Sequence, residues 1–125
     1  MVPHAEEWFK KADEDYRVAE RELAAEPPAY GAVCFHAQQA VEKLFKGLLV
    51  DAGVDFPRTH DLTFLLRVVN TKTSVFAALG DELTALSIAA VEVRYPGSQP
   101  DRRQADAAVA TMKAVFEIHD KHYGQ

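Results

Sequence analysis

The chain has 125 residues, of which 48% are hydrophobic and 26% are charged. This balance is typical of one soluble domain spanning residues 1–125. The net charge of −5 argues against a general affinity for nucleic acid, which requires a basic surface, and no DNA partner is expected. Cys34 is the single cysteine, so no internal disulfide is possible. No signal peptide or membrane-spanning run is visible, and we expect a cytoplasmic protein that does not contact a membrane.

Apolar residues at helical spacing predict a first helix over residues 5–25. They recur at steps of three and four residues: Trp8, Ala12, Tyr16, Ala19 and Leu23. Pro27 and Pro28 cannot continue this helix. A second helical pattern covers residues 34–53, and Gly53 is suited to its C-terminal cap.

Three further helices are predicted after a loop that contains Pro57. A short helix starts after Asp61 as N-cap, a longer one covers residues 75–95, and the last follows Asp101 as N-cap. No segment shows the alternation typical of a half-buried strand. The sequence therefore predicts an all-α fold, an up-and-down antiparallel bundle of four long helices and one short helix.

The second helix is apolar over about half its circumference, so we expect it to lie at the centre of the bundle. Its polar side aligns His36, Gln39 and Lys43 on one line, which Gly47 continues. A glycine inside a helix costs about 1 kcal/mol relative to alanine. Gly47 therefore indicates that another backbone, or a ligand, approaches closely there.

This polar side has two interpretations. It is either a solvated surface or a surface that binds something. Phe35 lies within it and favours the second interpretation, because an aromatic ring requires cover, which a second copy of the chain could supply. Gln38 interrupts the apolar side and is either a satisfied core amide or a contact across such an interface.

Other polar residues have a structural and a functional interpretation each. His60 either packs at the start of the third helix or faces a phosphate or base. Arg94 and Tyr95 either close the end of the fourth helix or offer a charged fork and a stacking plane to a nucleotide. His119 and His122 have no third metal ligand at a suitable spacing, so we predict neither a metal site nor a cofactor.

Four segments resemble the HEPN domain family, in the family's order and over nearly the whole chain. They are "AEEWFKKADEDYRVAERELA", "YGAVCFHAQQAVEKLFKGLLVDAG", "THDLTFLL" and "VEVRYPG". The resemblance implies a helical bundle that is usually dimeric. It also implies either nucleotide or RNA binding, ribonuclease activity, or a toxin–antitoxin pair with a minimal nucleotidyltransferase encoded nearby.

The ribonuclease branch of that family depends on an arginine followed by a histidine after four to six intervening residues. None of the arginines has a histidine at that spacing: Arg17, Arg21, Arg58, Arg67, Arg94, Arg102 and Arg103. Enzymatic activity is therefore not expected. The resemblance is closest to the non-catalytic, sacsin-like branch, which is thought to bind nucleotides.

We therefore predict a homodimer that binds a nucleotide or an RNA end and catalyses no reaction. The predicted binding residues are His36, Gln39, Lys43, His60, Arg94 and Tyr95. Lys43 and Arg94 would contact phosphate, Tyr95 would stack on the base, and the histidines would donate hydrogen bonds. One alternative is an interaction subunit of a nucleotidyltransferase. Another is a divergent ribonuclease that uses His60 with Arg94.

Overall fold

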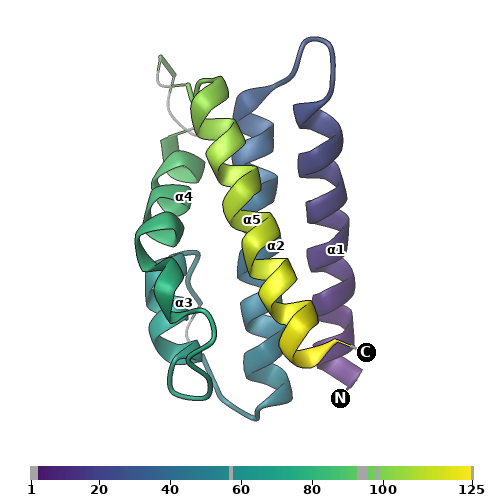
Figure 1. Cartoon of the computed structure of the whole chain (residues 1–125), viewed down its shortest axis with the longest axis vertical. Helices are drawn as coiled ribbons and strands as arrows, with labels where there is room; N and C mark the ends of the chain where they lie inside the picture. The colour runs from purple at the N-terminus through teal and green to yellow at the C-terminus, as the bar shows by residue number, and fades with distance from the viewer. Residues whose placement is uncertain (1–2, 57, 93–95, 98, 125) are drawn as a thin grey trace.

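The protein folds into an all-α bundle, as predicted. The computed structural model describes residues 3–56, 58–92, 96–97 and 99–124. Its elements are α1 (Pro3–Leu23), α2 (Tyr30–Asp51), α3 (Leu62–Val69), the 3₁₀ turn η1 (Ala77–Leu79), α4 (Gly80–Glu92) and α5 (Arg102–Tyr123). Figure 1 shows the four longer helices side by side, with α3 below α4. Within these described residues, no helix has both the length and the hydropathy that a membrane span requires.

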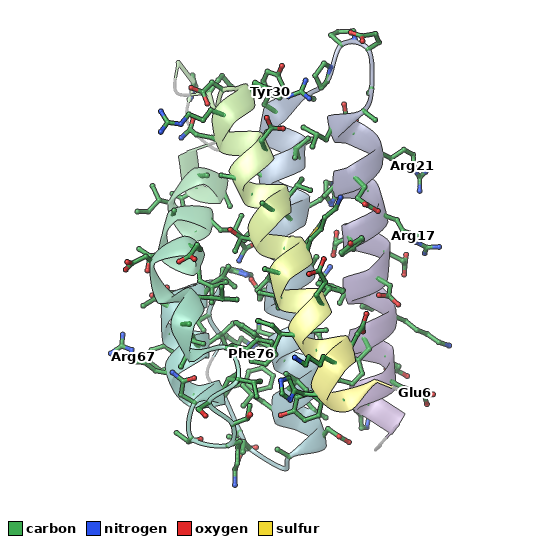
Figure 2. All side chains as sticks on the ribbon, viewed as in Figure 1. Glu6, Arg17, Arg21, Tyr30, Arg67 and Phe76 are labelled. Carbon is green, nitrogen blue, oxygen red and sulfur yellow. The ribbon has the colours of Figure 1, made fainter. Side chains whose placement is uncertain are left out.

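Helix α2 lies at the centre of the bundle, which confirms the expectation from its wide apolar side. It packs against α1, α3, α4 and α5. Phe45 of α2 is fully buried and contacts Phe76 with ring centroids 5.2 Å apart. Figure 2 shows Phe76 inside the bundle, whereas Arg17 and Arg21 point outward from α1. Burial of this apolar surface is the main stabilising contribution to the fold.

Two aspartates cap the helices that the sequence assigned to them. The side chain of Asp61 accepts a hydrogen bond from the Thr63 N–H at 2.9 Å, at the start of α3. Asp101 accepts from the Gln104 N–H at 2.8 Å, and the Gln104 side chain accepts from the Asp101 N–H at 3.0 Å. This reciprocal capping box satisfies backbone donors that the first turn of α5 would otherwise leave unpaired.

The fourth helix starts later than predicted. Residues 75–79 form a turn and η1, and α4 starts only at Gly80. The Thr73 hydroxyl accepts from the Val75 N–H at 3.4 Å, and the side chain of Phe76 is directed into the core. Gly80 is therefore the first residue of α4 and not an interior residue. Val91, near the end of α4, is 47% exposed.

Gly47 is required by a close approach, as predicted, but the approaching group is the side chain of Phe9 from α1. A Cβ atom at Gly47 would lie 2.6 Å from Phe9 Cε1 and 2.8 Å from Phe9 Cδ1. Non-bonded carbon atoms are normally about 3.5–4.0 Å apart. Gly47 therefore lets the Phe9 ring lie against the backbone of α2, and it brings α1 close to α2.

We predict that Gly47→Ala lowers the free energy of unfolding by about 1 kcal/mol. The gain in helix propensity, about 1 kcal/mol, is smaller than the cost of displacing the Phe9 ring. Denaturant unfolding followed by circular dichroism measures the difference. In a Phe9→Ala background the same substitution should be neutral or stabilising. Equal destabilisation in both backgrounds would contradict the role assigned to Phe9.

Candidate functional site

The polar side of α2 faces α1, and Asp15 of α1 binds two of its side chains, one histidine and one lysine. His36 Nδ1 lies 2.8 Å from Asp15 Oδ1, and Lys43 Nζ donates to Asp15 Oδ2 at 2.6 Å. Asp15 is only 8% exposed. His36 and Lys43 therefore lie on the line that the sequence predicted, and an internal carboxylate already binds both.

A second carboxylate, Glu42, lies on the same side of α2 and is 3% exposed. It accepts hydrogen bonds from Lys46 Nζ at 2.9 Å and from Gln38 Nε2 at 2.9 Å. His60 Nδ1 lies 2.9 Å from Glu42 Oε1, although the His60 side chain is 67% exposed. Glu42 therefore ties the loop before α3 to the centre of α2.

Gln38 is a satisfied core amide, which settles the alternative left open by the sequence. Its Nε2 donates to the backbone oxygen of His60 at 2.8 Å in addition to Glu42, and its Oε1 accepts from Gln39 Nε2 at 2.8 Å. Gln38 is 3% exposed. Gln39 and His60 therefore belong to one hydrogen-bonded cluster with Glu42.

Two aromatic rings cover the inner lysine of this cluster. Lys46 Nζ lies 5.7 Å from the ring centroids of both Trp8 and Phe56. Trp8 and Phe56 also contact each other edge to face, with centroids 6.4 Å apart. Cation–π contacts of this kind contribute about 1–2 kcal/mol when they are shielded from water. Lys46 thus joins α1, α2 and the loop after α2.

The pKa of Glu42 reflects this environment. Burial raises the pKa of the carboxyl group, but hydrogen bonds from Lys46, Gln38 and His60 outweigh burial and hold the pKa below its ordinary value of 4.5. Because the hydrogen bonds favour the ionised form, Glu42 is a carboxylate that stabilises the fold and not a carboxylic acid available for proton transfer near neutral pH.

An open groove of about 370 Å³ lies at the start of α2, next to His36. Its lining residues are Ala29, Tyr30, Gly31, Ala32, Phe35, His36 and Gln99. Phe35 contacts the His36 ring edge to face, with centroids 5.2 Å apart. The polar side of α2 therefore ends in a groove with two aromatic side chains and a histidine. Its volume is within the range of small-molecule sites, about 300–1,000 Å³.

The charges around the groove come from α1 and α5. Arg102 lies beside the Tyr30 hydroxyl. Hydrogen bonding to Tyr30 raises the pKa of Arg102, and hydrogen bonding to Asp106 raises it further. Figure 2 shows Tyr30 at the end of the bundle where α5 begins. Glu22 accepts from the Ala29 N–H at 2.9 Å, so a carboxylate already lies at the start of α2. Next to the groove-lining Tyr30, positive charge therefore comes from Arg102, which is also paired with Asp106 at 3.2 Å.

The structure brings only some of the predicted binding residues together. His36 lines the groove and shares Asp15 with Lys43, whereas Gln39 and His60 join the Glu42 cluster. Arg94 and Tyr95 lie outside the described residues. In the chain they fall between the end of α4 and Gln99, which lines the groove.

The sequence analysis missed Asp15, on which the polar side of α2 depends. Asp15 lies between Ala12 and Ala19 on the buried stripe of α1, three and four residues from them. A carboxylate on an apolar stripe indicates a buried partner of opposite charge. That pattern would have identified Asp15 among the many acidic residues of α1.

Cys34 lies in the hydrophobic core, and His119 lies at the edge of the core. Cys34 is fully buried. His119 packs between Phe9 and Tyr123, with ring centroids 5.2 Å and 5.5 Å away. Burial lowers the pKa of His119, and Asp120 and Asp13 offset part of that effect.

We predict that Asp15→Asn lowers the free energy of unfolding by about 2 kcal/mol, because Lys43 would lose its counterion in a partly buried position. Denaturant unfolding at neutral pH measures the change. Glu14→Gln is the matched control, since Glu14 is exposed on α1, and its effect should stay within about 0.5 kcal/mol. Equal effects of the two substitutions would show that the Asp15 ion pairs do not stabilise the fold.

Glu42→Gln should reduce stability in a pH-dependent manner. The pKa of Glu42 is lowered in the folded state, so its ionisation stabilises the fold above pH 4.5, and this contribution is lost as the pH falls through the folded-state pKa. The wild type should therefore exceed the variant most near pH 6 and least near pH 3. Urea unfolding across this range tests the prediction, and a difference that is independent of pH contradicts it.

Comparison with known proteins identifies a family model and two solved structures that are similar to this chain. The model of the HEPN domain matches residues 5–122. The chain is similar to TT1696 from Thermus thermophilus, with 24% identity, a TM-score of 0.81, and 96% of this chain and 98% of that chain covered. It is also similar to ST0689, an archaeal HEPN homologue, with 25% identity, a TM-score of 0.71, and 94% and 96% covered. No curated protein matches the chain. The family model spans nearly all of the bundle, and the chain belongs to the HEPN domain family.

Proposed function

We propose that this HEPN protein binds a nucleotide or an RNA end as a homodimer and catalyses no reaction of its own. The observation that carries the proposal is the open groove beside His36, which has Tyr30 and Phe35 among its lining residues. Aromatic side chains that border a groove stack on bases without requiring a particular base. The groove lies at the end of the polar line on α2 that the sequence identified.

The charges at the groove suggest how such a ligand would be oriented. Arg102 interacts with the groove-lining Tyr30, and its ion pair with Asp106 at 3.2 Å is exposed and therefore weak. Its guanidinium group would bind phosphate oxygens in a bidentate manner. Glu22, which accepts from the Ala29 N–H, would repel phosphate from the start of α2. The base would then lie against Phe35, with His36 and Gln99 as hydrogen-bonding groups.

The other predicted residues take secondary roles in this proposal. Lys43 contributes positive charge, but a phosphate would compete with Asp15 for its ammonium group. His60 and Gln39 support the shape of the polar side through the Glu42 cluster. Arg94 and Tyr95 precede the groove-lining Gln99 by five and four residues in the chain, and their contribution stays a prediction.

The missing arginine–histidine spacing supports a role in binding without catalysis. The structure adds that His60 lies on the buried carboxylate Glu42, which suits a structural role. A nucleotidyltransferase partner stays a prediction of the family resemblance.

Titration calorimetry with ATP, GTP and a short RNA tests the proposal. Saturable binding is expected below millimolar nucleotide, and Phe35→Ala should weaken it about tenfold or more through the loss of stacking. Lys43→Ala should weaken it less, because Asp15 already binds that lysine.

Phe64→Ala is the matched control, since Phe64 is a partly exposed aromatic residue on α3, away from the groove, and should leave the affinity unchanged. Absence of saturable binding at millimolar concentrations of every ligand would refute the proposed function. Binding that Phe35→Ala does not alter would place the ligand elsewhere.

A further inference from the structure

A second surface groove runs between α4 and α5, on the side of these helices that faces away from α2. Its volume is about 180 Å³. The lining residues are Glu82, Ala85, Leu86, Ala89, Gln104, Ala107, Ala108 and Thr111. Apart from the polar residues near its ends, the groove is lined by alanine and leucine. Small side chains on both helices leave room for another helix to approach closely.

A large apolar side chain stands directly beside this groove. Ile88 is 55% exposed, and it lies three residues after Ala85 and one before Ala89. Residues three apart are neighbours on a helix surface, so Ile88 and the groove belong to one face. The same face therefore presents both a protruding group and a cavity that could receive it, which is the requirement for an isologous contact between two copies.

The hydroxyl of Thr111, near one end of the groove, has no hydrogen-bond partner among the described residues. Thr111 is 8% exposed and lines the groove. The described residues contain no fully buried side-chain oxygen or nitrogen without a partner, so this hydroxyl is accessible from the groove. A molecule that fills the groove would therefore be expected to supply a hydrogen bond to Thr111.

Exposed side chains of opposite charge lie near the first turns of α4 and α5. Glu82 lies near the start of α4 and Arg103 near the start of α5, and Figure 1 shows that α5 begins at the end of the bundle where α4 finishes. Both side chains are exposed, and neither forms an ion pair with another described residue. A twofold axis perpendicular to the groove would place the Arg103 end of each copy on the Glu82 end of the other.

We propose that the face formed by Glu82, Ala85, Ile88, Ala89, Arg103, Ala107 and Thr111 is the contact between two copies of this chain. Ile88 of each copy would occupy the alanine-lined groove of its partner. The arginine of each copy would meet the glutamate and the threonine hydroxyl of the other. This inference rests on the homodimer of the proposed function and not on nucleotide binding. It leaves the groove next to Phe35 open to a ligand.

Sedimentation velocity over a wide concentration range, with the intact chain, tests the proposal. The wild type should sediment as a dimer of the 13.9 kDa chain. Ile88→Glu would place a charge in an apolar groove and should weaken dimerisation about 30-fold or more, as expected at the centre of an interface. Phe64→Glu is the matched control on α3 and should leave the dimer intact. Circular dichroism should show that both variants keep the helical content of the wild type.

A charge exchange gives a second, independent test. Glu82→Arg and Arg103→Glu should each weaken the dimer, because like charges would meet at both ends, and the double variant should restore it. A wild type that is monomeric at every concentration would overturn the homodimer itself. A wild-type dimer that neither Ile88→Glu nor the single charge variants weaken would overturn this assignment of its surface. Nucleotide titration of the same proteins separates either result from failure of the binding proposal.

Discussion

Two buried carboxylates, Asp15 and Glu42, determine how the central helix of this bundle is held. A helix that is apolar over half its circumference still has a polar half, and in this protein that half is largely enclosed by α1 and the loop after α2. Enclosure removes water from polar side chains, which is unfavourable unless hydrogen-bonding partners or, for a lysine, a group of opposite charge replace the water. Asp15 binds His36 and Lys43, while Glu42 binds Lys46 and the loop histidine. The orientation of α2 relative to α1 follows from these contacts and from the ring of Phe9 against Gly47.

This arrangement restricts where a ligand could bind. A donor that already binds an internal carboxylate contributes little affinity for a phosphate. Binding the phosphate would leave the buried carboxylate without its partner, which is unfavourable. Lys43 is therefore weaker evidence for a phosphate site than its position in the sequence indicates. The open groove lies at the N-terminal end of α2, beside Phe35 and His36. There an arginine from another helix, Arg102, supplies positive charge that is not enclosed.

The sequence predicts the helices well because their determinants are local. Apolar spacing and the capping residues Asp61 and Asp101 are properties of a few neighbouring residues, and the structure confirms them. The predicted start of the fourth helix, at residue 75, was wrong. Phe76 packs on Phe45 of α2, and no local sequence pattern indicates this contact. The close approach at Gly47 was predictable from the cost of a helical glycine, but its cause, Phe9, depends on how α1 is rotated. The partner of Lys43 and His36 likewise required the rotation of α1, although Asp15 on the apolar stripe was a usable indication.

The first turn of α5 connects the two surfaces to which function is assigned. Successive residues of a helix are rotated by about 100°, so Arg102 and Arg103 point to different sides of the same turn. Arg102 lies beside Tyr30 at the proposed ligand groove, and Arg103 directly precedes Gln104, which lines the groove between α4 and α5. The capping box of Asp101 and Gln104 fixes this turn, and Gln104 also lines the second groove. A contact that holds Arg103 in place would therefore also limit the movement of Arg102, because one short, capped turn carries both. Dimerisation and ligand binding, if both depend on this turn, are expected to favour each other through its rigidity.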